Sequence, residues 1–479
     1  MSVRRSLGIS ALTQLATFLL TLLGVTVVSR LLSPAEIGIF SVSTTLVAFA
    51  HIFRDFGAGQ YLIQVREVTR HTLRASFSVM LGISCLIAGS LYLVRGPVAG
   101  FYENDGVARV LELLALNFLI LPFGAPLLTL LRREMQFGRI AVVNVGSLSV
   151  QTAVTIGTAF AGQSYLSMAW GSLAGTLTSV VILVIIYPHN ALLLPTFKGL
   201  GEVVRFGTKS SATSLVNEVG NSAPDLVFGR TLGFEAVAYY SRANGLLSMV
   251  SGQLVSMVRG VYFPAFARSV REGKEPGPLY AQSMAYIVGI TAPAFALMSL
   301  LAAPLITFMF GTQWERSAPL ASLLCLYAVL NAPFAMAHAS AVACGKVGTV
   351  MRFQFVLQGV RVMVLLSSIW LPLEQVVLLL GGFAIFETCV QSGLLHYALG
   401  LRPGLLWRHV RSAYALIPLT LLGPAIVLRS SDLFAFDPGV FLTLVLSGLL
   451  ALAGWLAGVI CLGHPLRQEL MRFMPKRKA

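Results

Sequence analysis

The sequence predicts an all-α, polytopic membrane protein with about 14 transmembrane helices, built as two six-helix lobes followed by two C-terminal helices. Its composition, the length of its apolar runs and the placement of its basic residues lead to this prediction. Of the 479 residues, 56% are hydrophobic and only 11% are charged. A soluble domain carries about 25% charged residues. A soluble fold could not bury so much apolar surface, so lipid is the expected solvent for most of the chain.

Apolar runs of membrane-spanning length recur along the whole chain. A spanning helix needs about 20 mostly apolar residues. Fourteen runs come close to that length: 9–29, 36–56, 75–94, 110–131, 140–161, 165–187, 207–229, 235–258, 281–310, 317–343, 349–371, 373–398, 412–428 and 439–462. The first is too long for the apolar part of a cleaved signal peptide, so we interpret it as a transmembrane helix.

The basic residues indicate how the chain is oriented. The formal net charge is +15, and the 34 Lys and Arg residues lie mainly between the apolar runs. If the N-terminus is cytoplasmic, alternating loops place 25 of them on the cytoplasmic side and six on the outer side, with three inside spans. Cytoplasmic loops of membrane proteins are enriched in Lys and Arg. The sequence therefore predicts two cytoplasmic termini and explains its charge without nucleic acid as a partner.

A weak internal repeat predicts the domain organisation. Residues 26–46 and 226–246 match at an offset of 200, with five identical positions that include Arg30 and Arg230. Each copy covers the end of one predicted helix, a short loop and the start of the next. Transporters with parallel repeats bind substrate between the two halves. We expect an N-terminal lobe at 1–200, a C-terminal lobe at 201–400, and two further helices with a basic cytoplasmic tail at 401–479.

Five short motifs carry a resemblance to a known family. They are SRLLSPAEIGIFSV at 29–42, RDFGAGQYLIQ at 54–64, LRREMQF at 131–137, GQSYLSMAWGSLAG at 162–175 and VYFPAFAR at 261–268. In this order, they make residues 8–399 resemble the polysaccharide-export branch of the MOP (multidrug/oligosaccharidyl-lipid/polysaccharide) superfamily, the Wzx-type flippases of O-antigen and exopolysaccharide.

This resemblance implies a function, a location and partners. It implies two six-helix lobes around a cavity that carries an undecaprenyl-diphosphate-linked oligosaccharide across a bacterial inner membrane. The expected partners are that lipid-linked oligosaccharide, the membrane lipids, and a polysaccharide polymerase with chain-length or export machinery. The sequence has no Gly-rich nucleotide-binding loop and no hydrolase or metal-site motif. We therefore expect no enzyme activity, metal or cofactor, and any driving force would come from H+ or Na+ coupling or from onward processing of the product.

The predicted helix at 207–229 carries the strongest polar signal within a span. Ser214, Glu218, Asn221 and Asp225 are spaced 4, 3 and 4 residues apart, which places them on one helix face. Such a face cannot point toward lipid. It either lines a hydrated cavity or packs against polar partners within the protein. Asp225 and Glu218 are the candidate ion-coupling residues.

Helix 9–29, the repeat equivalent of that helix, has a milder polar face. Gln14, Thr17 and Thr21 are spaced 3 and 4 residues apart. They are candidates for the same cavity, and helix packing through small residues is the alternative. Arg54 and Asp55, at the inner end of the second span, are candidates either for gating or for a local ion pair that caps the helix.

Two arginines within spans are candidate substrate ligands. Arg361 shares a helix face with Gln358 and Gln354, and Arg242 lies within the eighth predicted helix. A guanidinium presents fork-shaped donors that suit phosphate oxygens. The alternatives are an internal ion pair with a carboxylate such as Glu387 or Asp225, and for Arg242 a side chain that reaches up to the membrane surface.

Other function classes stay open from the sequence. A cation-coupled small-molecule exporter of the MATE kind would use a smaller, acidic and aromatic site. A membrane enzyme such as a glycan polymerase would need a large outer loop, and the loops here are short. A non-transporting component of a glycan-assembly complex would leave the polar face of helix 207–229 without a purpose.

Overall fold

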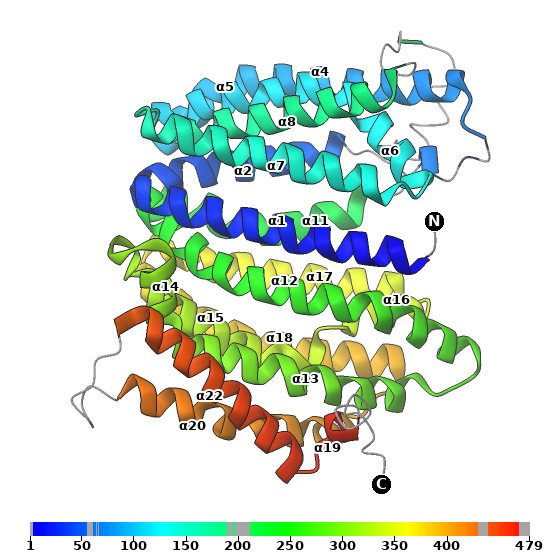
Figure 1. Cartoon of the computed structure of the whole chain (residues 1–479), viewed down its shortest axis with the longest axis vertical. Coiled ribbons are helices and arrows are strands. Elements are labelled where there is room, and N and C mark those ends of the chain that lie inside the picture. Colours follow the sequence, from blue (N-terminus) through cyan, green and yellow to red (C-terminus); the bar gives the residue numbers. More distant parts are fainter. Residues whose placement is uncertain are drawn as a thin grey trace. The chain divides into compact units, whose positions relative to one another are not determined.

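The protein is an assembly of helices in two compact units. The computed structural model describes residues 3–54, 61–63, 65, 67–188, 195–196, 211–429 and 439–468, and every regular element in these ranges is helical. The two units are Met1–Ala238 and Tyr239–Ala479. Figure 1 shows their helices coloured along the chain.

The first unit contains eight described α-helices and one 3-10 turn before the boundary helix. They are α1 (Val3–Leu31), α2 (Pro34–Arg54), α4 (Arg70–Tyr102), α5 (Asp105–Ile120), η1 (Leu121–Phe123), α6 (Ala125–Arg133), α7 (Phe137–Phe160), α8 (Leu166–Ile186) and α11 (Ser211–Thr231). Helix α12 (Phe234–Arg271) crosses the boundary between the units.

Small residues let the first unit's helices approach closely. Gly171 and Gly175 lie on the face of α8 that packs against α7. A Cβ added at Gly171 would overlap Thr155 Oγ1 and lie 2.8 Å from the backbone oxygen of Gln151. Spacing of small residues at four is the usual way for membrane helices to gain van der Waals contact, since lipid offers no hydrophobic drive for association.

The second unit is built around α13. Its elements are α13 (Pro276–Leu300), α14 (Ala302–Phe310), η2 (Thr312–Trp314), α15 (Ser317–Asn331), η3 (Ala332–Phe334), α16 (Ala337–Ala343), α17 (Val347–Leu366), η4 (Ser367–Ile369), α18 (Leu373–Leu399), α19 (Pro403–Tyr414), α20 (Leu416–Leu428) and α22 (Gly439–Cys461). Helix α13 packs against α15, α19 and α20, and the buried core includes Tyr280, Met284 and Val288 from it.

Two patterns of helix breaks recur along the chain. Helices α1 and α11 end at Leu31 and Thr231, and the helices after them begin at Pro34 and Phe234, so both breaks obey the offset of 200. A second shared pattern was not predicted from the sequence. In each unit, a Pro-containing 3-10 turn (η1 and η3) is followed by a short helix, a turn with positive φ and a long helix.

The packing groups α11 with the first unit, although it begins after residue 200. It packs against α2. The predicted boundary at residue 200 follows the sequence repeat, whereas the compact units follow contacts. The division into two six-helix lobes and two further helices stays a prediction.

The polytopic membrane fold is confirmed, but the count of 14 spans is not. Among the described residues, 11 helices are long and apolar enough to cross a membrane. Helices α2, α11 and α12 are not among them. Predicted spans 110–131 and 317–343 are also interrupted, by η1 and η3. Pro122 and Pro333 stand in these turns, and a proline lacks the N–H that a continuous helix needs.

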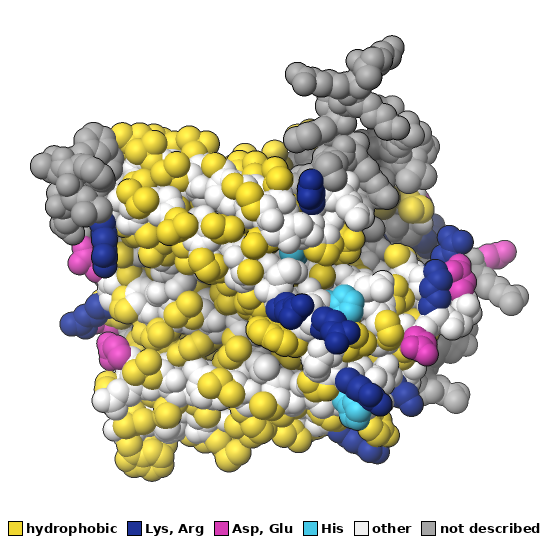
Figure 2. All heavy atoms as spheres, turned by 90° about the horizontal axis from the view of Figure 1, so that it is seen from below, with side chains coloured by type: hydrophobic (Ala, Val, Ile, Leu, Met, Phe, Trp, Pro, Cys, Tyr) yellow, Lys and Arg dark blue, Asp and Glu magenta, His cyan; other side chains and the backbone are white. Residues whose placement is uncertain are grey.

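Large apolar side chains cover much of the outer surface. Leu86, Leu93 and Ile185 are 73%, 77% and 71% exposed. Figure 2 shows one face on which hydrophobic side chains spread widely, while the charged side chains concentrate toward its two edges and one patch. Exposed apolar bands of this extent are typical of a surface that faces lipid.

Candidate functional site

The first polar cluster lies in the first unit, where α11 meets α2. Thr45 of α2 donates its hydroxyl to Asp225 Oδ2 at 2.9 Å. One residue farther along α11, the Leu226 carbonyl accepts a hydrogen bond from Tyr102 Oη at 3.2 Å. Asp225 is half-buried and directly follows the buried Pro224. The carboxyl group is thus held by a neighbouring helix.

The other predicted residues of α11 are in different surroundings. Glu218 accepts a hydrogen bond from Ser222, one turn later on the same helix, at 2.8 Å. Asn221 is exposed. The side chain of Ser214 lies outside the described residues. Among the described side chains of this predicted face, Asp225 is therefore the one that contacts a polar side chain of another helix.

The two threonine hydroxyls of the predicted polar face of α1 are satisfied within the helix. The Thr21 hydroxyl donates to the Thr17 carbonyl at 2.8 Å, and the Thr17 hydroxyl donates to the Thr13 carbonyl at 2.9 Å. Gln14 and Thr21 are both exposed. Hydroxyls that bond one turn back along their own helix need no polar neighbour, so these contacts do not by themselves mark a cavity.

The predicted pairing of Arg54 with Asp55 involves a residue, Asp55, that lies outside the described residues. Arg54 is half-buried at the end of α2. Close to these motifs, Arg133 donates to the carbonyls of Leu62 and Val65 at 2.7 and 2.6 Å. Arg133 of the LRREMQF motif therefore holds the backbone that follows the RDFG motif, a contact that the sequence did not predict.

The second polar cluster lies in the second unit and joins α16, α17 and α18. Gln354 Nε2 lies 2.8 Å from His338 Nε2, and Gln358 Nε2 donates to Gln354 Oε1 at 3.4 Å. One turn farther along α17, the charge of Arg361 interacts with the carboxylate of Glu387 on α18. The predicted face of Gln354, Gln358 and Arg361 is therefore a continuous polar row.

Residues of α18 and α15 extend this row. Gln391 hydrogen-bonds to Glu387, and Thr388 donates its hydroxyl to Asn331 Oδ1 at 3.1 Å. The Oε1 atoms of Gln358 and Gln391 are buried without a hydrogen-bond partner. Buried amide oxygens normally have partners, so the cluster retains acceptor capacity. Thr388 and Gln391 are three residues apart on α18, and Gln391 follows Glu387 by four, so this spacing was present in the sequence and was overlooked. Asn331, in contrast, lies alone within an apolar run.

Arg242 has an aromatic environment. Its guanidinium carbon lies 5.2 Å from the Trp314 ring centroid and 5.7 Å from that of Phe310, and both rings are buried. Its Nε is buried without a hydrogen-bond partner. Within the described ranges, no carboxylate lies within ion-pair distance of Arg242. The side chain is therefore held by cation–π contacts, with its charge not neutralised by an ion pair.

These clusters suit anions and protons better than metals. The described part of the chain has no group of three or more His, Cys, Asp or Glu side chains that could hold a metal ion. Arg242 and Arg361 offer guanidinium donors, and Asp225 and Glu387 are carboxyl groups with neighbours on a second helix. Such an arrangement can bind an anionic group or exchange a cation.

Comparisons with known proteins identify relatives in polysaccharide biosynthesis. Residues 27–319, more than half of the chain, match a family described as "Polysaccharide biosynthesis protein". Lipopolysaccharide biosynthesis protein WzxC of Escherichia coli is 22% identical over 65% of this chain and 64% of its own length. Succinoglycan biosynthesis transport protein ExoT of Rhizobium meliloti is 25% identical over 68% and 66%. The matched region thus covers slightly less than two thirds of either relative.

Solved structures confirm the fold class. The lipid II flippase MurJ, in an inward closed conformation, superposes with a TM-score of 0.76 over 96% of this chain and 99% of its own, at 11% identity. A multidrug resistance MATE transporter of the MOP superfamily gives a TM-score of 0.57 over 79% and 95%, at 16% identity. At these identities the likeness shows the fold alone.

Proposed function

The chain belongs to the polysaccharide biosynthesis protein family, and we propose that it is a flippase for a lipid-linked oligosaccharide. In this proposal, it moves an undecaprenyl-diphosphate-linked oligosaccharide from the cytoplasmic to the outer leaflet of a bacterial inner membrane, by alternating access, for surface polysaccharide synthesis. Both termini are cytoplasmic, and the onward partners are a polymerase and chain-length or export machinery. The names of WzxC and ExoT, and the bias of the basic residues, support this proposal.

The observation that carries the proposal is the state of Arg242. A charge within a membrane helix is costly, by about 2.5–3.5 kcal/mol on insertion scales. Arg242 has two buried aromatic rings beside it and no ion-pair partner in the described residues. A diphosphate would supply the missing negative charge and accept the fork-shaped donors of the guanidinium. We therefore assign the diphosphate contact to Arg242 first.

Arg361 has a different assignment. Because Glu387 already interacts with its charge, Arg361 is less available to a phosphate than Arg242. The row of Gln354, Gln358 and Arg361 presents amide and guanidinium donors, which suit sugar hydroxyls and acidic sugars. We assign this row, with the unpartnered oxygens of Gln358 and Gln391, to the glycan.

Coupling to an ion belongs to the same proposal. Asp225 is held by Thr45 on a neighbouring helix, so loss or gain of its charge changes a contact between α11 and α2. We propose Asp225 as the site where H+ or Na+ acts, with Glu218 in a supporting role. A cation-coupled exporter of small molecules would use the same carboxyl group, and the MATE transporter shares the fold. The experiments below separate the two functions.

The first experiment is complementation in the host. After deletion of the gene, wild type, Arg242→Gln, Arg242→Lys and Arg352→Gln are restored at matched membrane levels. Arg352 is the control, since it is an exposed arginine on α17. We expect Arg242→Gln to lower surface polysaccharide about tenfold, as for the loss of one charge-assisted contact, with lipid-diphosphate intermediates accumulating. Arg242→Lys should retain part of the activity, and Arg352→Gln all of it.

Two results would contradict this function. One is a deletion strain with normal surface polysaccharide and no accumulated intermediate. The other is a deletion strain that becomes sensitive to small cationic drugs instead, which would favour the MATE-like exporter. Transport by purified protein in vesicles at varied pH and Na+ then tests coupling. Asp225→Asn should remove the ion dependence, and an unchanged dependence would exclude Asp225 as the coupling site.

A further inference from the structure

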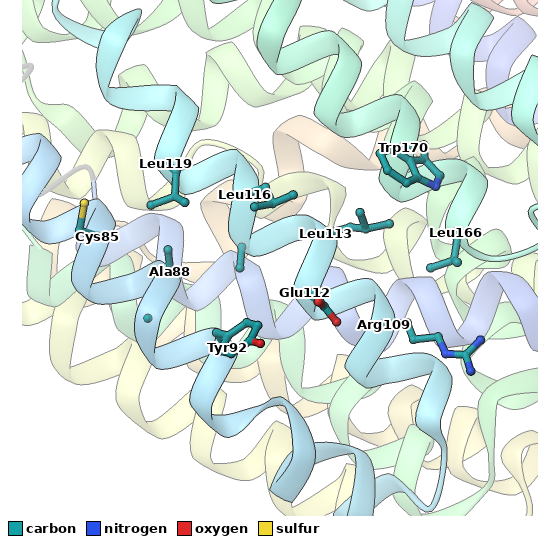
Figure 3. Close-up of a pocket in the computed structure, with 12 residues that line it drawn as sticks. Cys85, Ala88, Tyr92, Arg109, Glu112, Leu113, Leu116, Leu119, Leu166 and Trp170 are labelled. Carbon is teal, nitrogen blue, oxygen red and sulfur yellow. The ribbon is translucent and has the colours of Figure 1, made fainter.

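A groove on the first unit has no role in the transport described above. It has a volume of about 640 Å³ and lies between α4, α5 and α8. Figure 3 shows Leu116 of α5 pointing toward the side of Trp170 on α8, and Leu119 of α5 pointing toward the side of Cys85 and Ala88 on α4. The lining is apolar except at one end, where Arg109 and Glu112 stand. Binding pockets for small molecules have about this volume, roughly 300–1,000 Å³.

The charged end of the groove has a net charge of one positive unit. Arg95 Nη1 lies 3.3 Å from Glu112 Oε2, and the Arg95 guanidinium carbon lies 3.6 Å from the Tyr92 ring centroid. This pair is neutral together. Arg109 is exposed in the groove, and in the described ranges no carboxylate lies within ion-pair distance of it. The polar end of the groove therefore carries a single unpaired cation.

The two ends of the groove lie in different layers of a membrane. Helix α4 has 33 residues, which corresponds to about 50 Å, more than the roughly 30 Å of a hydrocarbon core. Its ends therefore project into the headgroup layers. Arg95 and Arg109 stand within about two turns of the α4–α5 connection at Glu103 and Asn104. The charged end of the groove is at headgroup level, and its apolar part runs toward the acyl chains.

We propose that this groove is a binding site for an anionic glycerophospholipid of the leaflet next to the α4–α5 connection. One acyl chain lies along Leu116, Leu119 and Trp170, and the phosphodiester contacts Arg109. A phosphodiester carries one negative charge, which the single unpaired cation neutralises. A polyprenyl diphosphate carries more charge and would leave part of it uncompensated. The bound lipid is therefore a membrane component that is distinct from the cargo.

The groove offers its own reporter, Trp170. The full-length protein is reconstituted in vesicles that contain acyl-brominated phosphatidylglycerol in phosphatidylcholine, or the reverse labelling. Bromine quenches nearby tryptophan fluorescence, and the difference between wild type and Trp170→Phe isolates this one of the five tryptophans. We expect Trp170 to favour the anionic lipid about fivefold, from one basic residue near the membrane surface. Arg109→Gln should abolish this preference, and Arg109→Lys should keep it.

A pair of glycine variants tests the apolar part. A Cβ at Gly89, which lines the groove, or at Gly82, seven residues earlier on the same face of α4, would meet no atom within 4 Å. Gly89→Phe should fill the groove and lower the quenching of Trp170 by both lipids. Gly82→Phe should leave it unchanged.

Three outcomes would overturn the site. The first is quenching of Trp170 that does not depend on the headgroup in the wild type. The second is an equal effect of Gly89→Phe and Gly82→Phe. The third is displacement of the brominated anionic lipid by an equimolar polyprenyl diphosphate, which would assign the groove to the isoprenoid lipid instead.

Discussion

Helix α22 supplies a hydrogen bond that α13 cannot make for itself. Pro293 in α13 has no backbone N–H, so the carbonyl of Gly289, four residues earlier, loses its helical partner. Trp455 of α22 donates its indole Nε1–H to that carbonyl at 2.8 Å. Gly289 is buried. Trp455→Phe removes the donor and keeps an aromatic ring at the contact.

The expected cost follows from this geometry. A buried acceptor left without a partner costs about 1–3 kcal/mol, and hydrogen bonds between helices in membrane proteins average about 0.6 kcal/mol, with a maximum near 1.7. We therefore expect Trp455→Phe to destabilise the protein by about 1–2 kcal/mol. In a Pro293→Ala background, the new N–H can bond to the Gly289 carbonyl. In that background, Trp455→Phe should cost only the packing that the indole loses. Its effect on stability should be about 1 kcal/mol smaller than in the wild-type background.

The assay is reversible SDS unfolding of the four proteins of this double-mutant cycle, followed by circular dichroism. Equal losses for Trp455→Phe in the wild-type and Pro293→Ala backgrounds would refute the reasoning, because the indole would then contribute through packing alone. Stabilisation by Trp455→Phe alone would refute it as well. Retained membrane insertion of all four proteins is the control.

Three further predictions concern stability. Gly171→Ala should lower the stability of the protein by about 1–3 kcal/mol, because the added Cβ overlaps Thr155. Gly157→Ala is the control, since its Cβ meets nothing within 4 Å, and it should be neutral or stabilising. Equal effects of the two variants in SDS unfolding would argue against close α7–α8 packing. Asn104→Ala should lower the stability of the protein by about 1 kcal/mol, because Asn104 Oδ1 accepts the Gly106 N–H at the start of α5 at 2.8 Å. Asn104→Asp should keep the stability of the wild type, whereas Asn104→Val should lose it as Asn104→Ala does. Burial lowers the pKa of His464 below 6.5, so the folded state resists protonation of this side chain. The free energy of unfolding should therefore fall as the pH drops below about 6.5. His464→Gln should flatten this dependence of stability on pH, and an unchanged dependence would mean that His464 does not cause it.

Spacing along one helix was readable from the sequence. Gln354, Gln358 and Arg361 share a face because side chains three and four residues apart are neighbours on any α-helix. The structure finds them in one polar row. The break between α11 and α12 could also be foreseen, since it repeats that between α1 and α2 at an offset of 200.

Contacts between segments that are distant in the chain could not be predicted from the spacing of residues along one helix. Thr45 and Asp225 are 180 residues apart, and Gly289 and Trp455 are 166 apart. Nothing in the local pattern of either segment selects its partner. The interruptions at Pro122 and Pro333 were missed for a different reason. Hydropathy is continuous across both prolines, whereas helical hydrogen bonding is not.

The sequence by itself determined the solvent, the class of secondary structure and the family. A chain with 56% hydrophobic and 11% charged residues must place its apolar side chains in lipid. Its apolar runs of about 20 residues then span the lipid as helices, which satisfy their own N–H and C=O groups where no water is present. The tertiary structure alone decided which groups each charge inside those helices meets. Glu387 comes close to Arg361, whereas Arg242 meets aromatic rings, because helix packing brings together residues whose separation in the chain carries no local signal.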